Sequence, residues 1–270
     1  MKHFLMIVVL IAVLATTAMA QDIETMMAGR AQIGAGLVSE AWLQNPAVLG
    51  LQANANGTVD GWQSSVSGVY EVEGDVDLRA LTYGGYPMGQ RWGVGAGLVD
   101  VSGMDSVGLG AGFGTPDGRM AAGLNYQSID MSYGGNADIF DFAVSGMLPD
   151  VCSAFDSGMW GIVARDVGDQ YERTFDLGIG FQSPDWTVAA DVEDFSDEVD
   201  TIFQIGVTRT FGAMRQWKVG AGVDDSNLTA GFVYSPTVDS SVSPWNIGLA
   251  WLEGDNGADD AWVVGASADF

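Results

Sequence analysis

The feature that most constrains the fold is an alternation, with a period of two, between large apolar residues and small or polar ones. It starts near residue 58 and recurs to the end of the chain. In VGLGAGF, from Val107 to Phe113, every second residue is glycine and the others are apolar. Because successive side chains of a β-strand point to opposite faces of the sheet, the pattern predicts many strands that share one apolar face.

Two kinds of connection alternate between these segments. One kind is mostly short and contains proline, as in TPDGR (115–119) and SPDW (183–186). The other is polar and carries most of the acidic residues, as in EVEGDVD (71–77), VDVSGMDS (99–106), IDMSYGGNAD (129–138), RDVGDQYER (165–173) and EGDNGADD (253–260). Short turns at one end and longer polar loops at the other are typical of outer-membrane barrels, with the short turns periplasmic. The segments predict an all-β, transmembrane, antiparallel up-and-down β-barrel of about 14 strands over residues 58–270.

Aromatic residues gather at one end of the predicted sheet. Tryptophans open segments that follow a short turn, and other rings close segments that run into such a turn or into the chain end. Amphipathic rings prefer the interface between membrane and water, so this end is predicted to carry an aromatic girdle. The predicted girdle consists of Trp92, Trp160, Trp186, Trp217, Trp245, Phe113, Phe181, Phe211, Tyr234 and Phe270. A soluble acidic β-sandwich would also alternate, but its large aromatics more often lie in the middle of strands.

The N-terminal residues 1–20 predict a cleaved secretory signal. A basic start at Lys2 precedes a short apolar run, and the small residues before Gln21 form an A-x-A site. The apolar run is too short to span a membrane comfortably. Export and a barrel together predict the outer membrane of a bacterium. Lipid and lipopolysaccharide are then the predicted surroundings, with the acidic loops bridged loosely to lipopolysaccharide by divalent ions.

Composition argues against several classes of function. The single histidine, His3, lies in the predicted signal, which excludes Ser-His-Asp hydrolysis and His-ligated zinc in the mature protein. The single cysteine, Cys152, excludes an intrachain disulfide. A formal net charge of -25 argues against nucleic-acid binding. The acidic loops lack EF-hand spacing and no two carboxylates stand at a catalytic spacing, so we predict no metal, no cofactor and no enzymatic activity.

Residues 21–57 do not alternate. Their apolar residues follow a roughly helical spacing that stops at Asn45-Pro46, which predicts a short helix and loop folded into the lumen as a plug. Inward glycines such as Gly93 and Gly112 would leave room for it. Asn45 before Pro46 is itself a strong turn signal. The predicted division is therefore a signal (1–20), a hatch (21–57) and a barrel (58–270).

One part of this segment resembles a known family. Gly29-Arg30-Ala31, then Gly34, then Asn45-Pro46-Ala47 and Leu49 resemble the N-terminal box of FadL-like outer-membrane transporters and the related PorV/PorQ-type barrels. The resemblance implies a hatch inside the barrel, with Arg30, Asn45, Pro46 and Ala47 as gating candidates. It also implies that small hydrophobic molecules pass the outer membrane.

Charged residues of the lumen give more specific expectations. Arg30 would pair with an inward carboxylate such as Asp176 or Asp191. Lys218 and Arg79 are expected among the lumen acids, because barrel strands alternate between apolar outward and polar inward residues. The final segment, Ala261–Phe270, closes on an aromatic residue, and it resembles the signal that bacterial barrels present to their assembly machinery.

Three functions remain open at this level. The first is passage of small hydrophobic molecules, which rests on the family resemblance. The second is a non-transporting barrel that acts as a secretion-system accessory or a structural partner-binding protein. The third is the soluble acidic β-sandwich, as a surface protein. A heat-modifiability gel after membrane fractionation separates the third from the first two.

Overall fold

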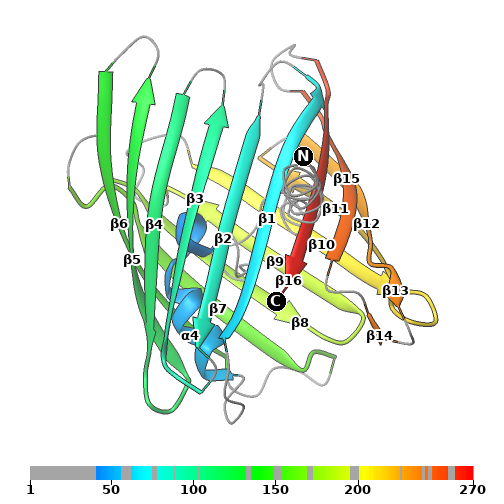
Figure 1. Cartoon of the computed structure of the whole chain (residues 1–270), viewed down its shortest axis with the longest axis horizontal. Helices are drawn as coiled ribbons and strands as arrows, with labels where there is room; N and C mark the ends of the chain where they lie inside the picture. The colour runs from blue at the N-terminus through cyan, green and yellow to red at the C-terminus, as the bar shows by residue number, and fades with distance from the viewer. Residues whose placement is uncertain are drawn as a thin grey trace, which may run out of the picture.

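The described part of the chain forms one closed barrel of antiparallel strands (Figure 1). The computed structural model describes residues 41–55, 62–74, 78–87, 89–101, 104–131, 135–148, 154–168, 173–194, 201–225, 227–238, 241–242, 245–254 and 259–269. The barrel strands are β1 (Trp62–Glu73), β2 (Arg79–Pro87), β3 (Trp92–Val101), β4 (Met104–Gly114), β5 (Met120–Met131), β6 (Gly135–Met147), β7 (Ser157–Ala164), β8 (Phe175–Gln182), β9 (Trp186–Glu193), β10 (Ile202–Phe211), β11 (Trp217–Asp224), β12 (Asn227–Tyr234), β15 (Trp245–Leu252) and β16 (Ala261–Asp269). A small hairpin, β13 (Thr237–Val238) and β14 (Ser241–Val242), lies in the connection from β12 to β15.

Each barrel strand pairs with its neighbour in the chain, and β16 pairs with β1 to close the sheet. Ser67 of β1 stands opposite Ser267 of β16 in this closing ladder. Closure gives the backbone N–H and C=O groups partners within the protein, which a strand in lipid requires. The predicted strand number is confirmed.

The apolar side chains face outward. In β4, Leu109 and Phe113 are each 61% exposed, whereas Gly108, Gly110 and Gly112 are buried on the inner face. A soluble protein would cover such residues, while a lipid-facing wall presents them. The β-sandwich alternative is therefore wrong, because the sheet closes on itself and keeps its large apolar residues outside.

The predicted connections hold at the short-turn end, and strands run further than expected at the other end. β3 continues to Val101 and β4 starts at Met104, inside the predicted loop 99–106. β5 and β6 likewise extend into the predicted loop 129–138. Outward Asp100 and Asp105 stand directly opposite each other in this part of the ladder, beyond the band of outward apolar residues that we call the apolar belt. This side of the wall is consequently taller than the side formed by β7, β8 and β9 (Figure 1).

The predicted girdle residues, apart from Phe270, which lies outside the described residues, are on the outward face near the short-turn end. Trp92 stands opposite Phe113, and Trp217 lies between Phe211 and Tyr234. Trp186, Trp245 and Phe181 also begin or nearly close strands at this end. Trp160 is set deeper than expected, because β7 begins at Ser157. Their place at the membrane interface stays a prediction.

Two rings that sequence analysis omitted join this set. Trp62 packs against Trp92, with ring centroids 5.8 Å apart, and its indole nitrogen donates a 2.9 Å hydrogen bond to the Tyr83 hydroxyl. Phe155 packs against Phe181 at 5.6 Å. No helix among the described residues is both long and apolar enough to cross a membrane.

Candidate functional site in the barrel lumen

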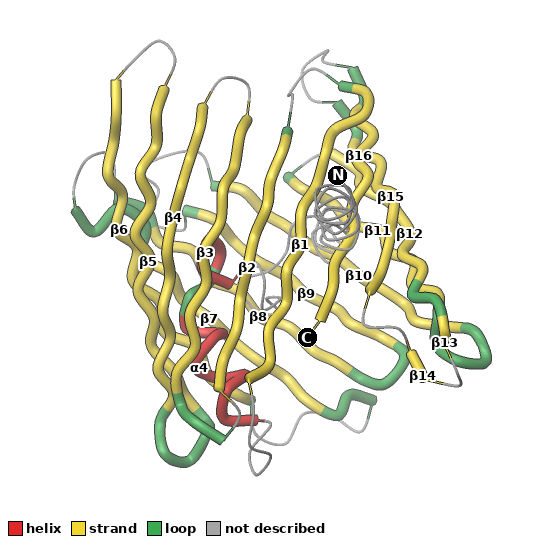
Figure 2. The backbone as a smooth tube through the Cα atoms, in the orientation of Figure 1, coloured by secondary structure: helices red, strands yellow, loops and turns green. Residues whose placement is uncertain are grey.

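Two short helices lie against the inner face of the barrel wall (Figure 2). Helix α3 (Ala41–Gln44) contacts β3, β4 and β5, and helix α4 (Ala47–Ala55) contacts β2 to β6. They belong to the segment 21–57 that was predicted as a hatch. The remainder of that segment, including Arg30, lies outside the described residues.

Glycines of the wall allow the backbone of this segment to approach closely. A Cβ atom added to Gly93 would lie 2.8 Å from the carbonyl oxygen of Leu49. One added to Gly112 or Gly123 would overlap the backbone at Pro46 or Ala47. Only glycine leaves space for this contact. The expectation that inward glycines accommodate inserted chain is therefore met at Gly93 and Gly112, and Gly123 adds to them.

Apolar side chains complete this packing. Ala47 and Leu51 pack in a buried cluster with Ala121, Ala143 and Val163 of β5, β6 and β7. A second buried cluster joins Ala41, Val48 and Leu49 within the segment itself. Close apolar packing therefore holds the segment along its length, and polar contacts hold it where it turns.

Asn45 fixes the turn between the two helices to the wall. Its side-chain amide donates a 2.8 Å hydrogen bond to the Ser145 hydroxyl, and that hydroxyl donates a 3.1 Å bond to the Asn45 amide oxygen. Both residues have no exposed surface. Pro46, which follows directly, is also buried. The turn expected from Asn45-Pro46 is thus present, and it is bonded to β6.

Arg165, which follows β7, holds the end of helix α3. Its guanidinium donates a 2.8 Å hydrogen bond to the carbonyl oxygen of Leu43 and a 2.9 Å bond to that of Gln44. These carbonyls are at the C-terminal end of the helix, where a cation is favourable. The same guanidinium pairs with Asp176, at 2.7 Å, and with Asp141, at 3.3 Å. We call Arg165, Asp141 and Asp176 the lumen clamp.

The two carboxylates of the lumen clamp are themselves held in place. Asp141 accepts hydrogen bonds from the Asn125 side chain, at 3.2 Å, and from the backbone N–H of Asp166, at 3.0 Å. Asp176 accepts a 3.1 Å bond from the backbone N–H of Asp194. Both carboxylate side chains are nearly fully buried, with 4% and 5% exposure, while that of Arg165 is 22% exposed. The two carboxylates of the clamp are therefore fixed in position, and they orient the Arg165 guanidinium toward helix α3.

Sequence analysis missed Arg165 and misplaced Arg79. Arg165 was assigned to the polar loop 165–173. It lies two positions after Val163, whose side chain faces inward, so it points inward as well. Arg79 was expected among lumen acids; instead it is exposed on the outward face, with its guanidinium 5.6 Å from the centre of the Tyr70 ring. It begins β2 above the apolar belt, where an outward charge reaches water. Lys218 does face inward, in register with Thr210.

The class of protein follows from this architecture. A closed antiparallel barrel with an apolar exterior and a polar, glycine-rich interior has the fold of an outer-membrane β-barrel. Its lumen contains a segment of the same chain, bound by named side chains of the wall.

Comparisons with known proteins place the fold more closely. No family model matches the chain, and no curated protein matches its sequence. Among solved structures, it is similar to the CymD monoaromatic hydrocarbon channel, with 13% identity over 92% of this chain and 96% of that chain and a TM-score of 0.54. A TodX monoaromatic hydrocarbon channel carrying a deletion has 11% identity over 90% and 97% of the chains, with a TM-score of 0.44. The KdgM porin has 9% identity over 77% and 99%, with a TM-score of 0.43.

Proposed function

We propose that this protein is a non-enzymatic passage for small hydrophobic molecules across the bacterial outer membrane, and that residues 41–55 control the passage from inside the barrel. The observation that carries the proposal is the contact of Arg165 with the Leu43 and Gln44 carbonyls. Arg165 is a side chain of the wall, and it binds the inserted segment through backbone carbonyl oxygens. Such a contact can open without any change in the wall.

Because of the lumen clamp, release of helix α3 costs little free energy. If α3 moves, Arg165 loses two hydrogen bonds to carbonyl oxygens but keeps Asp141 and Asp176 as partners. A buried charge left without a partner would be strongly destabilising, and the two carboxylates prevent this. Hydrogen bonds to charged groups contribute about 1.5 to 3 kcal/mol each, so the clamp favours the inserted state without making it permanent.

Two further features support a hydrophobic cargo. Val69, Val233, Ala250 and Val263 form an apolar cluster on the inner face of β1, β12, β15 and β16, away from the lumen clamp. The resemblance of the Gly29–Leu49 region to FadL-like transporters points the same way. So does the similarity of the fold to that of CymD, a monoaromatic hydrocarbon channel.

A second candidate is the non-transporting accessory barrel, as in the PorV-type resemblance. The close backbone contact of Gly123 with Pro46 and Ala47 favours it, because a segment seated this tightly fits a lumen that stays closed. In both candidates, assembly through the C-terminal strand and contact with lipopolysaccharide are proposed properties.

Proteoliposomes distinguish the two candidates. Uptake of a radiolabelled monoaromatic hydrocarbon would be compared with that of a sugar of similar size, for the wild type and Arg165→Met. A channel with this gate takes up the hydrocarbon faster than the sugar, and the variant takes it up faster than the wild type. No uptake by either protein, together with co-purification of a partner, would assign the accessory role instead.

A further inference from the structure

Arg209 is a cation on the outward face of β10, near the short-turn end of the barrel. It stands opposite Trp186 of β9 and opposite Val219 of β11. Phe211, two positions further along β10, stands opposite Trp217. These four neighbours are between 37% and 43% exposed on the same outward face. The guanidinium therefore belongs to an apolar surface, inside the predicted aromatic girdle.

No counter-ion for Arg209 is present among the residues that the structure describes. Its guanidinium lies 4.9 Å from the centre of the Trp186 ring. The carboxylate that precedes this ring in the chain, that of Asp185, pairs with Arg215 at 3.6 Å. Within the same described part of the chain, the indole N–H of Trp186 has no hydrogen-bond acceptor. A ligand that accepts hydrogen bonds and carries negative charge would satisfy both donors, and a charge on a lipid-facing wall lowers stability unless it is compensated.

The position of Arg209 along β10 indicates which anion can reach it. Arg209 is two positions, or about 6.6 Å, from the end of the strand at Phe211. A long arginine side chain keeps its charged head at the headgroup level while its stem lies along apolar surface. The short turns are predicted to be periplasmic, and the periplasmic leaflet of an outer membrane consists of phospholipids. The guanidinium is therefore expected at the level of phospholipid phosphates.

We propose that Arg209 and Trp186 bind the phosphate of one anionic phospholipid, phosphatidylglycerol, from the periplasmic leaflet. The planar fork of the guanidinium donates two hydrogen bonds to the phosphate, and the indole N–H donates a third. An acyl chain lies along Val207 and Val219, which are 37% and 40% exposed. The proposal rests on the barrel being in a membrane and is independent of passage through the lumen.

The charge around this site favours an anionic headgroup over a zwitterionic one. An ethanolamine or choline headgroup adds a cation, and the carboxylate beside the site, that of Asp185, already pairs with Arg215. Phosphatidylglycerol brings no cation. Each Lys or Arg near a membrane surface attracts anionic lipid by an amount equivalent to about fivefold in affinity. A preference of this size for phosphatidylglycerol is therefore expected from Arg209 alone.

Native mass spectrometry of the protein in mild detergent tests the site. The protein is offered phosphatidylglycerol, phosphatidylethanolamine and phosphatidylcholine with identical acyl chains. One phosphatidylglycerol is expected to stay bound, about fivefold more than either of the others. Arg209→Gln is expected to abolish this preference. Arg209→Lys keeps the charge but not the planar fork, and Trp186→Phe removes the indole N–H, so each is expected to give an intermediate preference.

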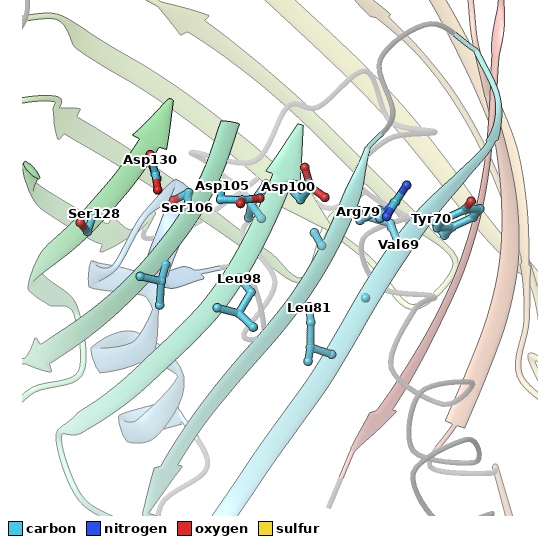
Figure 3. A pocket seen from close by; sticks show the side chains of 14 residues that line it. Val69, Tyr70, Arg79, Leu81, Leu98, Asp100, Asp105, Ser106, Ser128 and Asp130 are labelled. Carbon is cyan, nitrogen blue, oxygen red and sulfur yellow. The ribbon is translucent and has the colours of Figure 1, made fainter. Parts of the chain in front are cut away.

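Arg79→Gln is the matched control. Arg79 is also outward and lies beside an aromatic ring, that of Tyr70, but it is at the opposite end of the barrel. Figure 3 shows it lining a pocket on the outer face there, and Asp100 stands opposite it in the ladder. Its substitution should leave the preference for phosphatidylglycerol unchanged.

Folding of each variant is checked by the mobility shift on boiling, and Trp186→Phe serves if Arg209→Gln fails to fold. Three results would overturn the proposal. They are equal retention of the three lipids by the wild type, an equal loss of preference in Arg79→Gln, and an undiminished preference in Arg209→Gln.

Discussion

Asn45 and Ser145 are 100 positions apart in the chain, yet they exchange two hydrogen bonds inside the barrel. Neither residue is exposed. The amide therefore has no water to replace the hydroxyl, and the hydroxyl has none to replace the amide. This pair anchors the inserted segment to β6 by contacts that do not involve Arg165.

Removing one partner of this pair should be more harmful than removing both. Asn45→Ala leaves the buried Ser145 hydroxyl unsatisfied, and should lower the free energy of unfolding by about 1 to 3 kcal/mol. Adding Ser145→Ala should recover part of that loss, because no unsatisfied group then remains. Guanidinium unfolding in detergent micelles measures both. Additive losses in the double variant would show that the two side chains do not interact.

Loss of the Arg165 guanidinium should loosen the inserted segment. Arg165→Met removes both hydrogen bonds to helix α3 and leaves Asp141 and Asp176 without their cation, so hydrogen exchange at residues 41–49 should accelerate at least tenfold. Arg165→Lys keeps the charge but not the planar fork, and should give an intermediate effect. Lys218→Met, which removes a different inward cation, should leave this exchange unchanged. Equal protection in all three variants would contradict the clamp.

A methyl group at Gly123 should displace the segment. Gly123→Ala places a Cβ atom against the backbone at Pro46 and Ala47, so the segment must shift, at a cost of about 1 to 3 kcal/mol. The control is Gly168→Ala, where the new Cβ would meet the Phe140 ring at 3.4 Å, an ordinary contact. Limited proteolysis of the folded barrel should cut near residues 41–55 only in the first variant. Protection equal to the wild type would place the segment elsewhere.

A charged side chain on the outward face should lower stability more the deeper it lies in the bilayer. Leu109, in the middle of β4, is 61% exposed, and Leu109→Arg should lower bilayer folding stability by about 2 to 4 kcal/mol. Val72, near the far end of β1, is 59% exposed, and Val72→Arg should cost only about 0 to 1 kcal/mol. Refolding into vesicles under urea titration measures the difference. Similar values at the two positions would argue that this face does not contact lipid.

The barrel could be predicted from the sequence because its rules are local. Alternation gives the face of each residue, and turn composition gives the end of the barrel, so Trp92 and Phe113 could be placed on one face at the same end, where the structure pairs them. The lumen contacts could not be predicted in this way. Arg165 binds carbonyls of Leu43 and Gln44, more than 100 positions away, and backbone acceptors carry no signature in a sequence.

Arg79 shows where a local rule fails. The rule that polar residues face inward holds only at the depth of the apolar belt. β2 begins above that depth, so an outward Arg79 can contact Tyr70 and reach water. The depth of a strand end in the membrane depends on the height of the whole wall. That height cannot be predicted from the residues of one strand.

A reversible crosslink between the segment and the wall tests the central claim most directly. Asn45→Cys and Ser145→Cys would be introduced together with Cys152→Ser, and hydrocarbon uptake by proteoliposomes would be measured before and after reduction. If residues 41–55 control passage from inside the lumen, the oxidised protein takes up no hydrocarbon and reduction restores uptake to the rate of Cys152→Ser alone. Equal uptake in the oxidised and reduced states would contradict the account.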